Sequence, residues 1–88
     1  MFDLLKVSKA FSDKNRLKIL SMLSNGTKNV GEVADTLKVE ENLASHHLRV
    51  LAGLGFLKSN KKGREVYYGI NRDKVDSVLN DLKKEILK

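Results

Sequence analysis

The chain's only two histidines stand side by side, His46 and His47, in the stretch LASHHLRVL. Imidazoles can bind a metal ion, move a proton in catalysis, or donate hydrogen bonds to a partner. A metal pair on one helix needs ligands three or four residues apart, and neither histidine has His, Asp, Glu or Cys at that spacing. The pattern therefore predicts no metal site on this stretch.

Catalytic chemistry has equally little support. There is no glycine-rich phosphate loop, and Ser45 and His46 are sequence neighbours that point apart on a helix, not a nucleophile beside its base. The chain contains no cysteine, which removes a thiolate metal site, a disulfide and a thiol redox switch. We expect no catalytic residue, no cofactor and no enzyme activity.

The stretch 41–54 has the period of a helix, on which adjacent residues point about 100° apart. One polar stripe on it combines an Arg that can bind guanine, an Asn that can bind adenine, and hydroxyl and imidazole donors. A Glu at its start can accept from cytosine N4. The candidate DNA-reading residues are Glu41, Asn42, Ser45, His46 and Arg49. The alternative is an ordinary solvent-exposed helix face.

His47 falls on a different face of the same helix, between Leu43 and Leu51. We expect it to pack at the edge of the core and to make one hydrogen bond. Ala44 and Leu48 should point deeper into the protein.

A second cationic cluster lies within seven residues that contain no acid: Lys58, Lys61, Lys62 and Arg64. We expect a turn at 61–63, whose glycine would let the loop approach a phosphate backbone. The alternative is an ordinary lysine-rich hairpin tip.

The composition supports an anionic partner. Lys and Arg number 17 against 11 Asp and Glu, which gives a net charge of +6, and the pI is near 9.7. Such a balance is typical of nucleic-acid binding, although it also suits an anionic membrane surface. No apolar run is long enough to span a membrane or form a signal-peptide core, so we expect a cytoplasmic protein without a membrane anchor.

Apolar spacing predicts five helices and one hairpin, in the order α-α-α-α-β-β-α. That order is mainly α with a β-hairpin wing, a winged helix-turn-helix. We expect one domain over 1–88. Its parts are a first helix at 2–11, a second to residue 23, a helix-turn-helix at about 30–54, a wing at about 56–70 (strands 56–60 and 65–70), and a C-terminal dimerisation helix at about 72–87.

The last helix carries an apolar stripe that is wide for a surface helix on so small a domain. The first helix offers a matching surface. We expect a two-fold homodimer through both helices, which would place two recognition helices about one DNA turn, ~34 Å, apart. The candidate interface residues are Leu4, Leu5, Val75, Val78, Leu79, Leu82 and Ile86.

Several segments together resemble the ArsR/SmtB family of small winged-helix repressors, over about residues 10–70. The segments are DKNRLKIL (13–20), ASHHLRVL (44–51), GLGFL (53–57), KGR (62–64) and VYY (66–68). The resemblance implies a homodimer that binds an inverted-repeat operator in double-stranded DNA and represses transcription. It also implies a signal, commonly a metal, that releases the DNA.

The departures from the family concern its metal sites and its recognition helix. Where one metal-sensing type has C-x-C, this chain has Asn29-Val30-Gly31, and where another has ligands on the last helix it has Arg72, Lys74, Glu85 and Lys88. Cationic side chains repel a zinc ion, so both familiar sites are expected to be absent. Glu40-Glu41 replaces the usual Ser-Gln, which predicts an unusual operator preference.

Two other uses of the same fold remain open. A protein-interaction module within a larger assembly needs an exposed apolar patch on the recognition helix or wing, where this chain has charge and hydrogen-bonding groups. An RNA-binding module is compatible with a basic wing.

Overall fold

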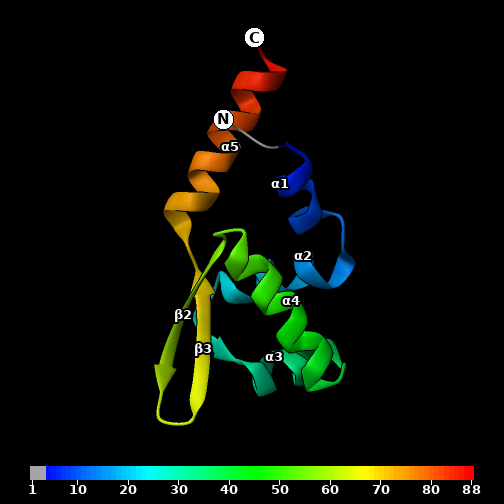
Figure 1. Cartoon of the computed structure of the whole chain (residues 1–88), viewed down its shortest axis with the longest axis vertical. Helices are drawn as coiled ribbons and strands as arrows, with labels where there is room; N and C mark the ends of the chain where they lie inside the picture. The colour runs from blue at the N-terminus through cyan, green and yellow to red at the C-terminus, as the bar shows by residue number, and fades with distance from the viewer. Residues whose placement is uncertain (1–3) are drawn as a thin grey trace.

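The computed structural model describes residues 4–88, which form five helices and three short strands (Figure 1). In chain order these are α1 (Leu4–Phe11), α2 (Lys14–Leu23), β1 (Lys28–Asn29), α3 (Val30–Leu37), α4 (Glu41–Gly53), β2 (Leu57–Lys62), β3 (Glu65–Ile70) and α5 (Arg72–Ile86). The predicted order of helices and hairpin strands is confirmed, and the fold is a winged helix-turn-helix. The additional strand β1 was not predicted.

Side-chain caps mark where α2 and α3 begin. Asp13 Oδ1 accepts hydrogen bonds from the backbone N–H groups of Asn15 (2.8 Å) and Arg16 (3.2 Å) at the start of α2. Asn29 and Glu32 form a reciprocal capping box on α3, each side chain accepting from the other's backbone N–H. Such caps satisfy amides that have no partner within the helix, so polar residues at these positions define the boundaries.

A tight turn joins α3 to α4. Lys38 has φ 58° and ψ 47°, the left-handed conformation, and its N–H donates to the carbonyl of Asp35. The next residue, Val39, donates to the carbonyl of Ala34 at 3.1 Å. Only three residues separate the helices, so α4 must turn sharply away from α3, as the recognition helix of a helix-turn-helix does.

The strands form one antiparallel sheet in the order β1-β3-β2. Lys62 pairs with Glu65, so the turn consists of Gly63 and Arg64, and Gly63 has φ +62°. The predicted turn at 61–63 is therefore wrong, because Lys61 and Lys62 both belong to β2. Strand pairing extends two residues beyond the apolar pattern from which the strand end was predicted.

The core lies between the helix-turn-helix, α2 and the sheet. Its largest fully buried side chains are Phe56, Ile19, Leu48, Leu51 and Val33. The Phe56 ring packs edge-to-face against Phe11, with centroids 5.4 Å apart. Phe56 also donates its N–H to the carbonyl of Leu51 and accepts from the N–H of Asn71. These bonds join α4, the wing and α5 at one point.

The described residues extend over 45 × 23 × 20 Å. In Figure 1, α1 and α5 lie towards one end of the long axis, and α3 and the wing tip lie towards the other. No helix within residues 4–88 is long and apolar enough to cross a membrane.

Candidate nucleic-acid interface

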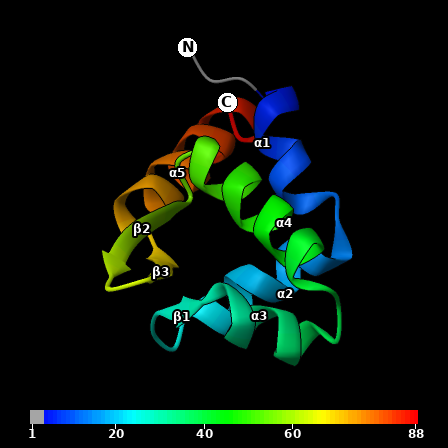
Figure 2. The same ribbon diagram turned by 60° about the horizontal axis from the view of Figure 1, so that its bottom comes forward.

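Helix α4 presents one buried face and one polar face. Ala44, Leu48 and Leu51 are fully buried, as the helical period predicted. The polar candidates Glu41, Asn42, His46 and Arg49 are exposed, and Ser45 is half-buried. In Figure 2, α4 (green) lies towards the viewer, with the β2–β3 hairpin on one side and α3 below it. A helix that is anchored by one face can offer the other to a groove.

His47 belongs to the buried face. The residue is 5% exposed, which confirms the expected burial, and burial lowers the pKa of the imidazole. The expected hydrogen bond is not formed. His47 Nε2 lies 3.9 Å from Asp13 Oδ1, beyond hydrogen-bond distance, and Nδ1 has no partner among the described residues. Leu43, which the sequence placed beside His47 on an apolar stripe, is 42% exposed.

Glu41 packs against the beginning of α3. A Cβ atom added to Gly31 would lie 3.2 Å from Glu41 Oε1, so the carboxylate lies over the first turn of that helix. A negative charge is favourable there because of the exposed N–H groups and the helix dipole. Glu41 therefore lies between the two helices of the helix-turn-helix, a position that its sequence neighbours alone did not indicate.

The wing carries its cations on both faces. Lys58, Lys61, Lys62 and Arg64 are all exposed. Because side chains alternate along a strand, Lys58 and Lys62 share one face of the hairpin and Lys61 points to the other. Lys62 Nζ lies 5.3 Å from the centroid of the Tyr67 ring, a cation–π contact. The sequence analysis did not predict the contact of Lys62 with Tyr67. Once the position of the turn is known, the pairing of the two strands identifies which residues lie close together across the hairpin.

The apolar surface at the other end of the molecule involves α1 and α5. Leu5 (79%), Leu79 (49%) and Ile86 (67%) are exposed, whereas Val75 and Leu82 are partly buried. Val78 is only 4% exposed and belongs to the core of its own chain, which corrects its assignment to an interface. The side chain of Leu4 lies outside the described residues. Phe11, Leu17, Leu20, Val75 and Leu79 also line a groove of about 430 Å³.

Metal-binding side chains are scattered over the part of the chain that is described. No three His, Cys, Asp or Glu residues lie close enough together there to hold one ion. Residues 29–31 stand where one metal-sensing type of the family has C-x-C. Here Asn29 forms the capping box of α3, and Gly31 lies beneath the Glu41 carboxylate.

Other proteins resemble this chain in sequence and in fold. The sequence pattern described as bacterial regulatory protein, arsR family, matches residues 13–59. The transcriptional repressor SdpR of Bacillus subtilis is 33% identical over 82 residues, which cover 89% of this chain and 91% of SdpR. A cadmium resistance transcriptional regulatory protein CadC homolog of Staphylococcus aureus is 41% identical over 78 residues, covering 88% of this chain and 64% of that protein.

Solved structures agree with the sequence comparison. An ArsR-like transcriptional regulator from Rhodococcus superposes with a TM-score of 0.82 at 28% identity, covering 92% of this chain and 76% of that one. A homodimeric winged helix-turn-helix DNA-binding domain from Mycobacterium bovis gives 0.76 at 26% identity, covering 97% and 82%. With its helix-turn-helix, wing and sequence pattern, this chain belongs to the arsR family of bacterial transcriptional regulators.

Proposed function

We propose that the protein is a dimeric repressor that reads an inverted-repeat operator in duplex DNA. The observation that carries this proposal is the geometry of α4. Its inner face is fully buried at Ala44, Leu48 and Leu51, and its outer face presents groups that pair with base edges. SdpR, which aligns along nearly its whole length, is itself named a transcriptional repressor.

In this proposal the polar face of α4 contacts bases and the wing contacts phosphates. Asn42, Ser45, His46 and Arg49 enter the major groove and contact bases, with Glu41 at the entry of the helix. The wing cations contact phosphates, which supply affinity but little sequence information. Contacts of the first kind would determine which operator is bound, and contacts of the second kind would hold the protein on any duplex.

A second copy of this chain would provide the second recognition helix. We infer that exposed apolar residues of α1 and α5 bury one another across a two-fold axis, and the homodimeric domain from Mycobacterium bovis supports this arrangement. After the correction of Val78, the proposed interface consists of Leu4, Leu5, Val75, Leu79, Leu82 and Ile86.

The wing can be tested by its salt dependence. Changing Lys61, Lys62 and Arg64 to Ala is expected to weaken binding to all duplexes alike and to flatten the plot of log affinity against log salt by about 0.9 per lost phosphate contact. Filter binding or fluorescence anisotropy over a salt series measures this slope. Lys84→Ala, an exposed change on α5 far along the chain from the wing, is the control. An unchanged slope in the triple variant would place the wing away from DNA.

Metal sensing of the two familiar kinds is absent in this proposal, although one relative is named for cadmium resistance. The chain has no thiol, and three of the four positions matching the last-helix ligands carry cations, Glu85 being the exception. Zinc, cadmium and arsenite are therefore expected to leave the protein–operator complex intact in a gel-shift titration. Stoichiometric metal binding accompanied by DNA release would contradict this.

A competition experiment separates the DNA-binding function from the two other uses of the fold. Labelled duplex DNA bound to the protein is challenged with unlabelled duplex DNA and with duplex RNA of the same sequence. Our proposal predicts that DNA competes and RNA does so poorly, because A-form RNA hides the groove that a helix reads. Equal competition would favour an RNA-binding module, and failure to bind either would favour a protein-interaction module.

A further inference from the structure

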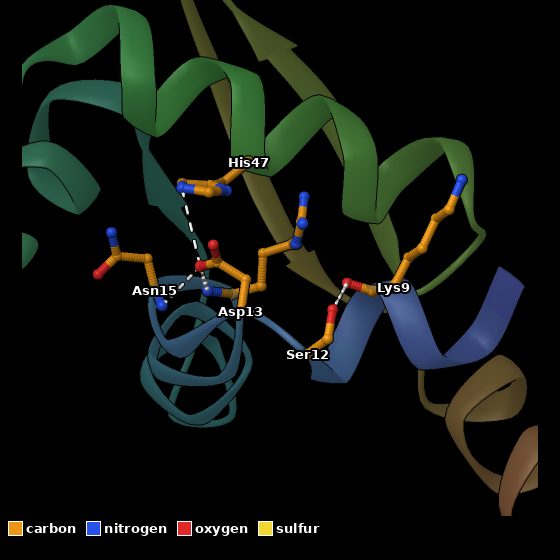
Figure 3. Close-up of polar contacts among 6 residues, drawn as sticks. Lys9, Ser12, Asp13, Asn15 and His47 are labelled. Carbon is orange, nitrogen blue, oxygen red and sulfur yellow. Dashed lines mark hydrogen bonds and ion pairs between the residues drawn. The ribbon is translucent and has the colours of Figure 1, made fainter. Parts of the chain in front are cut away.

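One buried imidazole of the recognition helix faces the carboxylate at the start of α2. Figure 3 shows His47 reaching from α4 towards Asp13. The same Asp13 Oδ1 that lies 3.9 Å from His47 Nε2 also accepts the capping bonds from the N–H groups of Asn15 and Arg16. One carboxylate oxygen therefore serves the helix cap and faces the recognition helix.

The contact is incompletely satisfied. Within residues 4–88, neither His47 Nδ1 nor Arg16 Nε has a hydrogen-bond partner, and both atoms are buried. An unpaired buried polar group costs free energy, so such groups in a native structure call for an explanation. A histidine ring changes its hydrogen-bonding capacity when it gains a proton, because both nitrogens then donate.

The charges around His47 act in opposite directions. Burial is the largest effect and lowers the pKa of the imidazole, and the positive charge of Arg16 and the neighbouring His46 lower it further. Within the described part of the chain, Asp13 alone raises it. Asp13 at the N-cap of α2, Arg16 on α2 and His46 on α4 are the charged and titratable groups among residues 4–88 that act on the ring.

Asp13 itself stays ionised in the range where histidine titrates. Partial desolvation opposes its ionisation, but the hydrogen bonds from the N–H groups of Arg16 and Asn15, with His47, lower the pKa of its carboxyl group below the ordinary value. The negative charge of Asp13 is therefore constant over this pH range, and only the protonation of the His47 imidazole changes.

We propose that Asp13 and His47 are positioning residues that make the seating of the recognition helix depend on pH. Neutral His47 packs between α2 and α4. In mild acid the ring must carry a charge in a buried site where Arg16 and His46 oppose it, and α4 loses its fixed position. The inference rests on the proposed role of α4 in DNA binding for its functional meaning, although the contact itself can be tested without DNA.

The direction of the pH effect follows from linkage. The pKa of His47 is lower in the folded chain than in the unfolded chain, so the unfolded chain binds more protons near that pKa. The stabilisation that the neutral ring provides is present above the unfolded value of about 6.5 and is lost as pH falls below it, towards the folded pKa. Asp and Glu titrate mainly at lower pH, so a comparison of about pH 7.5 with about pH 5.5 reports chiefly on histidine.

Thermal unfolding of the free protein at these two pH values, at fixed protein concentration, is the first measurement. The parent is expected to melt at a lower temperature at the acidic pH, and His46→Gln is expected to show the same drop. In His47→Gln, which keeps a polar side chain without a titrating group, the drop is expected to be at least halved. An equal drop in His47→Gln and the parent would overturn the proposal.

The second measurement does not depend on replacing His47. Asp13→Asn keeps an amide oxygen that can cap α2 but removes the charge. The chain has only two histidines, so proton NMR can follow both rings, with the single Gln variants assigning them. The His47 midpoint is expected to move to lower pH in Asp13→Asn, because the carboxylate that raises the pKa of the imidazole loses its charge. An unmoved midpoint would overturn the proposal.

A DNA titration at both pH values connects the contact to function. Operator affinity of the parent is expected to fall in acid by a larger factor than that of His47→Gln. If the parent fails to bind DNA at about pH 7.5, the proposed function fails. If the parent binds DNA at that pH but its affinity changes with pH by the same factor as that of His47→Gln, only the positioning role fails.

Discussion

Replacing Leu79 and Leu82 together with Glu is expected to convert the protein into monomers that bind duplex DNA weakly. Leu79 is 49% exposed on the single chain and Leu82 is half-buried, so both offer apolar surface at the proposed two-fold interface. A buried, unpaired carboxylate is strongly unfavourable in such a contact. Because a dimer engages two half-sites at once, loss of the partner is expected to lower operator affinity by about 10²–10⁴-fold.

Sedimentation and operator titration measure the two parts of this prediction. The matched control adds the same two charges to exposed polar positions of the same helix, Ser77→Glu with Asn80→Glu, and is expected to remain dimeric. Circular dichroism checks that each variant is folded. The interface is wrong if the double-leucine variant stays dimeric, or if the parent sediments as a monomer at micromolar concentration.

Truncation of Arg49 is expected to give the largest loss of sequence-specific affinity from a single change. If the guanidinium binds guanine through two hydrogen bonds, Arg49→Ala costs ~1–3 kcal/mol, roughly 5- to 150-fold. His46→Ala is expected to reduce specific affinity less. Both side chains are exposed and outside the core, so the melting temperature should change little.

For His47→Ala, on the same helix, we expect the opposite pattern of effects on stability and specificity. The ring is buried, so its removal is expected to lower stability more than specificity. A thermal melt and an operator titration on each single variant compare the three positions. Should His47→Ala melt like the parent and lose operator recognition, the assignment of faces on α4 is rotated by one residue.

Local patterns were sufficient to predict the helix-turn-helix. The helix-turn-helix was predicted at about 30–54, and its two helices span 30–37 and 41–53, because capping residues and an apolar period act within a few turns of the chain. The buried face of α4 followed from the same period. Both features depend on neighbours in sequence, which a pattern can show.

Features that depend on distant parts of the chain were missed. Strand β1 has two residues and exists because Lys28 and Asn29 pair with β3, some forty residues further along the chain. The stripe on α5 identified an apolar face, but only the packed structure separates Val78 in the core from Leu79 at the surface. The predicted hydrogen bond of His47 failed for the same reason, since Asp13 comes close to the ring without reaching it.

Selection of bound sequences from random duplex DNA tests most directly whether a two-fold dimer of this protein binds a specific duplex sequence. We predict enrichment of an inverted repeat whose half-site centres are about one helical turn, ~34 Å, apart. Arg49→Ala should bind the same repeat with a relaxed preference at one symmetric pair of positions. Recovery of no preferred sequence, or of a single half-site without its repeat, would contradict the claim.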